Sequence, residues 1–520
     1  MPILTEGFAE SKPDELAIVD DHRCISWSEL DARVNQIING LRSAEIGEGD
    51  TISILCGNRI EWFETALACI NMGVTHVPVN WHLVAPEIAY ILGDSGSKAV
   101  IVGHQYLDQM TKALSDEQAQ GIELALVIGA ESHGRFVNYE EFFGHCTNQA
   151  PLNQSFGGPM FYTSGTTGNP KGVRSSLSVM EPGTTPEVWQ LIVAGLNDMV
   201  GNPQTTVLCG PVYHSAQWAF SFMPLLGGAT TVMQHRYDSA GLLQLIDTHQ
   251  ATNVHLVPTQ MKRLVDLPNE VKAGFDGSSM NLYLHGAAPC PPVVKRSLID
   301  WWGPKISEYY GSTEGSIISL IDSEQWLQKG GSVGRPLPNI EILVLADDGS
   351  TLGAGEHGTL YFRNSLGTDF EYHNSPEKTA EAHKEPGVFT TGDVGYLDDD
   401  GYLWLSDRKI DMIISGGVNI YPAEIESVLG GHPLVGDVAV IGVPNLEYGE
   451  AVKAVVVAND SAGADDQLAE NLASYCRESL AGYKCPRSFD FVDELPRTGT
   501  GKVKKRLLRE PYWADHERSI

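Results

Sequence analysis

The sequence predicts an α/β fold. A large N-terminal domain of α/β subdomains plus a small β-rich subdomain is followed by a small α+β C-terminal domain. With 520 residues the chain is too long for one compact core. Short apolar runs alternate with helical patterns until about Ser332, where strands and tight turns take over, and the character changes again after Asp407. We therefore predict domains over residues 1–407 and 408–520.

The first α/β run contains short, β-rich apolar segments of the kind found in buried parallel strands. Expected strands are Leu16–Val19, Thr51–Leu55, Thr75–Pro78, Ala99–Val102 and Leu124–Ile128. The segment from Ser26 predicts a helix, because Leu30, Val34, Ile37, Ile38 and Leu41 recur at helical spacing. Further helices are expected around Trp62–Met72 and Ala85–Leu92, and 131–154 is read as a polar connection into the loop described below.

The later segments predict a second α/β run and then β-structure. In the second run Pro211–Phe220 should end a strand and begin a helix, and the run continues through the segments that begin at Val254 and Leu282 and closes with Ser307–Gly315. The acidic run Asp398–Gly401 predicts a hairpin turn rather than a calcium loop, since it separates two alternating apolar strands. In the last part, we expect strands at Val438–Val443 and Ala451–Val457 and a helix at Gln467–Leu480.

The charge balance limits the partners. Against 35 Lys and Arg stand 66 Asp and Glu, a net charge of −31 that should repel nucleic acid and anionic membranes. The eight cysteines form no CxxC pair and no zinc-like spacing, which favours reduced thiols in a cytoplasmic protein. The N-terminus does not resemble a signal peptide, and no apolar stretch approaches a transmembrane length. An anionic ligand would therefore need locally placed cations.

The segment Tyr162–Val173, YTSGTTGNPKGV, has the composition of a loop that binds polyphosphate. Its glycines let backbone N–H groups approach anionic oxygens, its hydroxyls donate further hydrogen bonds, and its lysine supplies charge. A Walker A loop has a different glycine–lysine spacing, and the alternative is a plain surface turn. The phosphate-binding candidates are Thr163, Ser164, Gly165, Thr166, Thr167, Gly168 and Lys171.

This loop resembles the signature of the adenylate-forming superfamily, which includes the acyl-CoA synthetases, luciferases and peptide-synthetase adenylation domains. The resemblance covers nearly the whole chain, and it implies ATP, Mg²⁺ and CoA as ligands and a mobile C-terminal lid. It is also compatible with a homodimer. After Val173 the family usually carries a histidine, whereas this chain reads RSSLSVMEPGTTPE.

A second motif is YYGSTEG, 309–315. By resemblance, Tyr310 stacks on adenine, Thr313 contacts phosphate and Glu314 holds Mg²⁺. A carboxylate beside a phosphate loop would repel ATP unless a hard cation lay between them. The neighbouring nucleotide-site candidates are Tyr309, Gly311 and Ser312.

Further roles follow from the resemblance. Asp393 and Arg408 match the ribose-binding positions, and Lys502 matches the mobile catalytic lysine, whose charge would bring the carboxylate and the α-phosphate together. Lys504, Lys505, Arg506 and Arg509 are expected to form only a solvated basic face. The SGG turn Ser415, Gly416 and Gly417 should admit the pantetheine arm after rotation about 407–411, where Ile410 replaces the usual polar hinge residue.

The acid site is expected near His214, which the resemblance places at the acyl pocket and the approach of the thiol. Gly286, Ala287 and Ala288 are expected to form a pocket wall, and His285 is expected to be structural. The resembling enzymes that prefer acetate carry tryptophan where this chain has Gly311. Together with Ala216, the small residues predict a deep pocket for a fatty, aryl or sterol-derived acid, closed at its far end by Trp218 or Phe220.

The function expected from the motifs is ATP-dependent ligation of a carboxylic acid to CoA through an acyl adenylate, with release of AMP and pyrophosphate. Three alternatives remain: an adenylation enzyme that loads a carrier protein, a non-catalytic nucleotide-binding descendant and a luciferase-like oxygenase. No carboxylate stands in the YHSAQW segment to bind an amino group, and Glu314 and Lys502 are both present, which favours the ligase.

Overall fold

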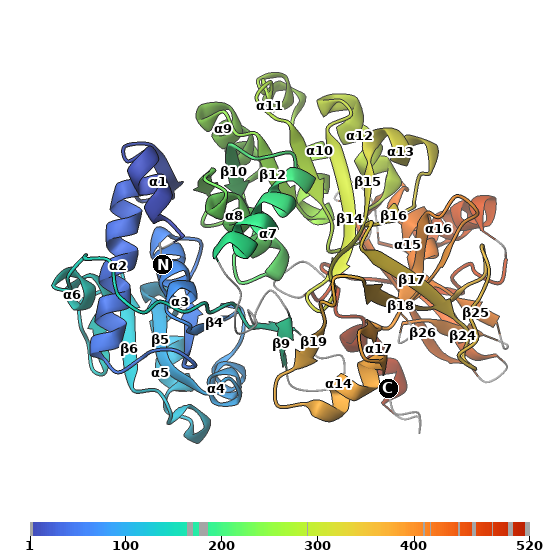
Figure 1. Ribbon diagram of the computed structural model, residues 1–520. Coiled ribbons are helices and arrows are strands. Elements are labelled where there is room, and N and C mark those ends of the chain that lie inside the picture. The colour runs from blue at the N-terminus through green and yellow to red at the C-terminus, as the bar shows by residue number, and fades with distance from the viewer. Residues whose placement is uncertain are drawn as a thin grey trace.

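The computed structural model describes residues 4–163, 170–175, 186–288, 290–408, 411–415, 418–445, 448–459, 464–480, 482–497 and 503–514. The chain runs from an N-terminal α/β subdomain through a second α/β subdomain into a β-rich subdomain, and ends in a separate α+β unit (Figure 1). The predicted fold class is confirmed.

The N-terminal subdomain is a parallel sheet in the order β4-β3-β5-β6-β7. Its strands are β3 (Thr51–Leu55), β4 (Thr75–Pro78), β5 (Ser97–Gly103), β6 (Leu124–Ile128) and β7 (Phe136–Asn138). Its helices are α2 (Trp27–Ser43), α3 (Ile60–Asn71), α4 (Ala85–Asp94), α5 (Leu107–Ala113) and α6 (Tyr139–Gly144), preceded by α1 (Glu6–Ser11). Every residue of β3 is buried, as expected for a strand covered on both faces.

Helix α2 shows how the sequence sets an element. Ser26 caps the helix by accepting the backbone N–H of Glu29, and the Glu29 carboxylate accepts the backbone N–H of Ser26 in return. The predicted apolar face is fully buried from Leu30 to Leu41. The polar connection 131–154, in contrast, contains β7 and α6, which the sequence analysis did not predict, and buries Phe136, Tyr139 and Phe143.

The second subdomain is a mixed sheet in the order β16-β15-β14-β13-β12-β10-β11-β1-β2. Its strands are β1 (Leu16–Val19), β2 (Cys24–Ser26), β10 (Thr205–Leu208), β11 (Thr230–Met233), β12 (Asn253–Leu256), β13 (Leu282–His285), β14 (Ile306–Ser312), β15 (Ser316–Asp322) and β16 (Arg335–Pro336). Its helices are α7 (Pro186–Met199), α8 (Ser215–Leu226), α9 (Ser239–His249), α10 (Pro258–Val265), α11 (Asn269–Ala273), α12 (Pro292–Trp302) and α13 (Ser323–Gln328). The N-terminal strand β1 pairs in parallel with β11, so it belongs to this sheet and not to the first.

The β-rich subdomain contains β17 (Ile340–Leu345), β18 (Gly358–Asn364), β20 (His383–Glu385), β21 (Val388–Phe389), β22 (Asp393–Leu397) and β23 (Leu403–Arg408), with α14 (Pro376–Ala382). The predicted hairpin at Asp398–Gly401 is confirmed, since β22 and β23 are antiparallel. The Asp398 carboxylate there pairs with Lys329 at 3.0 Å. A small sheet of β8 (Phe161–Thr163), β9 (Lys171–Ser175) and β19 (Phe370–Tyr372) joins the signature hairpin to this subdomain.

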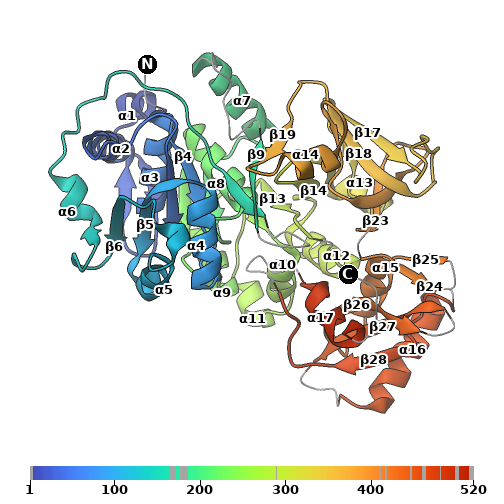
Figure 2. The same ribbon diagram turned by 90° about the horizontal axis from the view of Figure 1, so that it is seen from below.

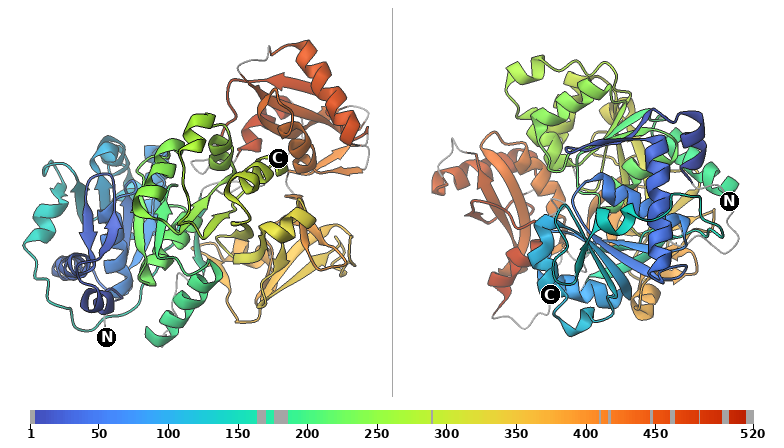
Figure 3. Two further views of the ribbon diagram at one scale, coloured as in Figure 1. Left: turned by 90° about the horizontal axis from the view of Figure 1, so that it is seen from above. Right: turned by 90° about the vertical axis from the view of Figure 1, so that its left-hand side faces the viewer.

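The chain after β23 forms its own sheet and core. Its elements are β24 (Ile413–Ser415), β25 (Val418–Ile420), α15 (Pro422–Gly430), β26 (Val435–Asn445), β27 (Gly449–Ala458), α16 (Asp466–Ser479), β28 (Ser488–Phe491) and α17 (Lys505–Trp513). Seen from below and from above, this unit is a separate body beside the β-rich subdomain (Figures 2 and 3). Within the described residues, none of the helices combines the length and the apolar character needed to cross a bilayer.

Candidate active site

The signature loop leaves from a hairpin whose two ends are fixed. Thr163 at the end of β8 lies opposite Lys171 at the start of β9. The Tyr162 hydroxyl donates to the Asp94 carboxylate at 2.6 Å, which ties the hairpin to the end of α4 in the first subdomain. The predicted phosphate ligands between the two ends, Ser164, Gly165, Thr166, Thr167 and Gly168, lie outside the described residues.

Lys171 and Glu314 are brought together by a tyrosine that the sequence analysis missed. The Lys171 ammonium lies 4.6 Å from the centre of the Tyr372 ring, and the Tyr372 hydroxyl donates to Glu314 Oε1 at 3.0 Å. Tyr372 reaches them because β19 pairs with β9, with Tyr372 opposite Val173. A cation and a carboxylate at one place suit a bound phosphate and its metal ion.

The electrostatics at Lys171 depend on its surroundings. Burial, and then the nearby Lys378, lower the pKa of the Lys171 ammonium, while Glu314 and Glu381 act in the opposite direction. Two lysines, Lys171 and Lys378, and two carboxylates, Glu314 and Glu381, therefore lie within electrostatic reach of one another at this point.

The chemistry of Glu314 fits a magnesium ligand. Glu314 is half-buried, and its second carboxylate oxygen accepts no hydrogen bond from a described residue. Mg²⁺ is commonly held by one or two carboxylates together with substrate phosphates and water, so a single glutamate fits this ion. No cluster of three or more metal-ligating side chains occurs in the part of the chain that the structure describes.

The predicted adenosine-site residues converge from two sheets. The Tyr310 hydroxyl donates to Asp393 Oδ2 at 2.6 Å, and the Thr391 hydroxyl donates to the same oxygen at 2.7 Å. Asp393 in turn lies opposite Arg408 in the register of β22 and β23. The hydrogen bond therefore joins Tyr310 to a carboxylate 83 positions away in sequence, and the strand pairing places the backbone of Arg408 opposite that residue. Thr391 was missed, although it adjoins Asp393 in the TTGD motif.

Thr313 is held by Ser215, a third residue that the sequence analysis missed. Its hydroxyl lies 2.9 Å from the hydroxyl of Ser215, at the start of α8. The neighbouring Ser312 hydroxyl accepts the backbone N–H of Gly315 at 2.9 Å, which closes the turn after β14. The only sequence signal for Ser215 was its position next to His214.

His214 caps the N-terminus of α8 by position, and its Nε2 atom is buried with no hydrogen-bond partner among the described residues. Burial lowers the pKa of His214 to about 4, so the ring is neutral at pH 7. It lies beside Tyr213, with ring centres 5.1 Å apart. His285 is buried next to the Lys295–Glu308 ion pair, as a structural histidine would be.

Glycine at 311 is explained by the close approach of the neighbouring backbone, which the sequence analysis did not consider. A Cβ atom there would lie 2.1 Å from the Ser316 carbonyl oxygen, because β14 and β15 are irregular at this point. Glycine at 311 therefore has a packing reason of its own, because a larger side chain would require the backbone of β14 or β15 to shift, and it does not by itself indicate the depth of a pocket. Gly286 is restricted in the same way, with a Cβ atom 2.5 Å from the Tyr309 ring.

Other parts of the predicted pocket are also revised. Ala287 is exposed in a left-handed conformation with φ of 67°, and Ala288 is half-buried. Trp218 does not close the pocket, because it is buried in the core of the first two subdomains, stacked on Phe222. Phe220 lies instead against Tyr309, with ring centres 5.1 Å apart.

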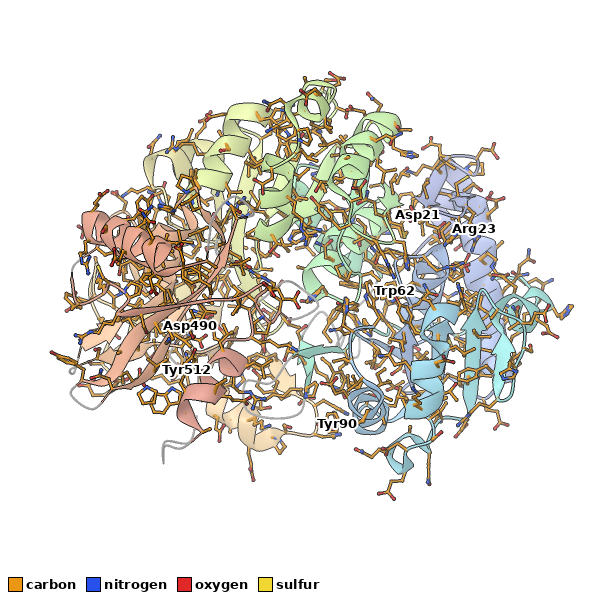
Figure 4. The ribbon with its side chains drawn as sticks, turned by 180° about the vertical axis from the view of Figure 1, so that it is seen from behind. Asp21, Arg23, Trp62, Tyr90, Asp490 and Tyr512 are labelled. Carbon is orange, nitrogen blue, oxygen red and sulfur yellow. The ribbon has the colours of Figure 1, made fainter. Side chains whose placement is uncertain are left out.

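The C-terminal candidates are only partly described. Ser415 is half-buried and pairs with Gly449, whereas Gly416, Gly417, Ile410 and Lys502 lie outside the described residues. The expectation of a solvated basic face is wrong for two residues. Arg509 is 8% exposed and pairs with Asp411 at 2.9 Å, and Lys505 pairs with Glu426 at 2.8 Å. Tyr512 on the same helix α17 bonds Asp490 (Figure 4), so the helix is fastened to the sheet behind it.

Comparison with known proteins agrees with this geometry. The AMP-binding enzyme family matches residues 5–368 and its C-terminal domain matches residues 424–502. The chain is 31% identical to a feruloyl-CoA synthase from an Amycolatopsis species, over 97% of each chain. It is 32% identical to the long-chain-fatty-acid–CoA ligase FadD13 from Mycobacterium tuberculosis, over 94% of this chain and 93% of the relative.

Among solved structures, the o-succinylbenzoate CoA synthetase of Bacillus subtilis with its acyl-adenylate intermediate has a TM-score of 0.81 and 27% identity, over 98% of each chain. The match therefore extends over both parts of the molecule. The chain belongs to the AMP-binding enzyme family and, within it, to the adenylate-forming acyl-CoA synthetases.

Proposed function

We propose that this protein joins an apolar carboxylic acid of medium to large size to CoA in two steps at one site. The acid first attacks the α-phosphate of ATP to give an acyl adenylate and pyrophosphate. The CoA thiol then attacks the acyl carbon and AMP leaves. The mixed anhydride makes this second step feasible, because AMP is a far better leaving group than hydroxide.

The observation that carries the proposal is the Lys171–Tyr372–Glu314 arrangement beside the Tyr310–Asp393 hydrogen bond. Tyr310, Asp393 and Arg408 would hold the adenosine, and the loop 163–171 with Thr313 would hold the phosphates. Glu314 would bind Mg²⁺, which screens the phosphate charge when bound. Lys502 would neutralise the two anions as they meet.

The C-terminal unit, residues 408–520, would act as the lid that changes position between the steps. Arg408 is held in β23 opposite Asp393, and Asp411 is held by Arg509. The rotation we propose would therefore be concentrated at positions 409–410. It would withdraw Lys502 and bring Ser415, Gly416 and Gly417 to the site for the pantetheine arm.

The class of acid is proposed from the apolar cluster around Tyr309, on the strand that carries Tyr310 and leads to Thr313. Six partly buried apolar side chains pack against Val200, Leu284 and Tyr309, namely Met199, Ala216, Phe220, Leu282, Ile317 and Leu320. Such a cluster favours a fatty or aryl acid over acetate, at about 0.8 kcal/mol for each buried methylene. The relatives named above act on feruloyl and long-chain fatty acyl groups, which supports the apolar class without choosing within it.

The experiment is pyrophosphate release with a panel of acids from acetate to long-chain and aryl acids, each with and without CoA. A ligase should release pyrophosphate and form a thioester only with its preferred acids. Pyrophosphate release without thioester formation would indicate that a carrier protein is the acceptor. Absence of release with every acid would contradict the proposal.

A further inference from the structure

A line of buried polar side chains runs behind the proposed acid site. The backbone N–H of Gly210 donates to Gln217 Oε1 at 3.3 Å, and Gln217 Nε2 lies 2.8 Å from His255 Nδ1. His255 Nε2 then lies 3.1 Å from the Tyr309 hydroxyl oxygen. Gln217, His255 and Tyr309 are 3%, 2% and 7% exposed.

The direction of each hydrogen bond follows from the first. A backbone N–H can only donate, so the Gln217 atom facing Gly210 is the amide oxygen, and its NH₂ group faces His255. Nδ1 of His255 must therefore accept. Burial lowers the pKa of His255 to about 3, so the ring is neutral and carries its one hydrogen on Nε2.

The Tyr309 hydroxyl oxygen therefore accepts the hydrogen bond from His255 Nε2–H, and the hydroxyl's own hydrogen is not used in that bond. Among the described residues none accepts this hydrogen. A buried hydroxyl that keeps an unused donor is uncommon, because burial without a partner costs the desolvation of that group. The arrangement thus presents one hydrogen-bond donor that the protein itself does not use.

The donor lies on the apolar side of β14. Consecutive residues of a strand point to opposite faces, so Tyr309 faces away from Tyr310 and the adenosine candidates. Its surroundings are the apolar set described above, with Phe220 at 5.1 Å between ring centres. Helices α7 and α8 lie over the neighbouring strands β10 and β12 of the same sheet (Figure 1), and α8 begins at Ser215, which bonds Thr313.

The donor is also remote from the reacting carboxylate. Tyr309 lies three residues before the end of β14 at Ser312, up to about 10 Å of strand at roughly 3.3 Å per residue, and Thr313 follows in the turn. An acid whose carboxylate lies near Thr313 would reach Tyr309 only with its far end.

We propose that Tyr309 donates its hydroxyl hydrogen to an oxygen on the distal part of the acid. The substrate is then an elongated, largely apolar carboxylic acid with an ether, hydroxyl or carbonyl oxygen far from its carboxylate. This inference rests on the proposed function, because it assigns the acid that the same site takes. Gln217 and His255 are positioning residues that set the direction of the Tyr309 donor.

The test uses pairs of acids that differ only in that oxygen. In para-methoxycinnamic and para-ethylcinnamic acid, an ether oxygen replaces a methylene at nearly constant size, and a methyl ether accepts but cannot donate. A long-chain pair, with and without an ether oxygen near the far end, covers the alternative shape. We expect wild-type kcat/KM for pyrophosphate release to be at least tenfold higher for the ether in one of the pairs.

The matched variants are Tyr309→Phe and Tyr283→Phe. Tyr283 is buried on the opposite face of the neighbouring strand, stacked on Trp302 at 4.0 Å between ring centres. Tyr309→Phe should lower kcat/KM for the ether at least tenfold more than for the ethyl acid and so remove the preference, while Tyr283→Phe should keep the wild-type ratio between the two acids.

Two results would overturn the inference: a wild-type enzyme without preference in either pair, or an equal loss for both acids of a pair in Tyr309→Phe. The wild-type comparison decides the question even if Tyr309→Phe does not fold. In both cases the ethyl acid or another acid would still release pyrophosphate, so the proposed function would stand.

Discussion

The carboxylate of Asp411 lies 2.9 Å from the guanidinium of Arg509, and this ion pair joins the start of the C-terminal unit to the helix that follows Lys502. Arg509 is 8% exposed, so removal of one partner would leave a nearly buried charge unpaired. The pair makes α17 and the start of β24 move together.

We expect Ile410→Pro to change the two half-reactions unequally, because proline fixes one backbone angle between two held residues. One half-reaction should fall at least tenfold more than the other. Adenylate formation is measured by pyrophosphate release, and thioester formation by adding CoA to a synthetic acyl adenylate. Ile410→Ala removes the side chain but keeps backbone freedom and should spare both. Equal rates in the proline variant would argue against this hinge.

Tyr372→Phe should raise the Mg²⁺ concentration needed for half-maximal pyrophosphate release several-fold. The hydroxyl bond to Glu314 is lost, and a hydrogen bond to a charged group contributes about 1.5–3 kcal/mol. The ring under Lys171 remains in this variant but not in Tyr372→Leu, which should be worse. If both variants matched wild type at every Mg²⁺ concentration, Tyr372 would have no part in the site.

Lys502→Ala should reduce adenylate formation at least 100-fold and leave thioester formation from a synthetic acyl adenylate largely intact. The positive charge is needed only where two anions meet. Arg506→Ala is the control, since the Arg506 side chain is 60% exposed on the same basic run. An equal loss in both half-reactions would contradict this division of labour.

Ala216→Trp should shift preference from long or bulky acids toward acetate and propionate. It replaces Gly311→Trp as the test of pocket depth, because any Cβ at 311 meets the Ser316 carbonyl oxygen. Ala216 packs against the apolar cluster around Tyr309. If the acyl chain binds there as proposed, a large side chain at 216 should shorten the space for it. The ratio of kcat/KM for the long acid and for propionate is the measurement. An unchanged ratio would place the acyl chain elsewhere.

Stability should fall on acidification partly because of His76. This residue is fully buried near Trp62 and Trp218, and burial lowers its pKa from 6.5 to about 3. The unfolded state alone takes up the proton between these values. The contribution is therefore complete above pH 6.5 and is lost, at about 1.4 kcal/mol per pH unit, as the pH falls toward 3.

Replacing His76 should flatten this dependence. In urea unfolding between pH 6 and 4, His76→Leu should lose stability less steeply than wild type by about 1.4 kcal/mol per pH unit. His133→Gln, at an exposed position, should keep the wild-type slope. A His76→Leu slope equal to that of wild type would show that the ring is already protonated in the folded protein.

The sequence predicted those features that depend on local pattern. The apolar spacing from Leu30 to Leu41 gave helix α2, and the bounds of β1, β3, β4 and β6 agree with the predicted strands. The aromatic residues Phe136 and Phe143 could have indicated structure in 131–154, had the spacing been weighed against the polar composition.

The features that the sequence did not predict depend on partners that are far away in the sequence. Tyr372 carries no motif and reaches Glu314 only through strand pairing between β19 and β9. The need for glycine at 311 comes from a backbone oxygen across an irregular strand pair, which no periodicity reveals. Likewise Lys505 and Arg509 look solvated in sequence, because their acidic partners lie 79 and 98 residues away. Their burial follows from tertiary packing alone.

The pairing of β1 with β11 has a consequence for synthesis. Ile18 lies opposite Thr231, so β1, the first strand of the chain, gains its parallel partner only after more than 200 further residues have been translated. Until then the edge of β1 that faces β11 is open, and an unpaired edge is prone to join other chains. We expect a nascent chain stopped before residue 230 to recruit chaperones or to aggregate. The sheet of the second subdomain cannot be completed until β11 has been translated.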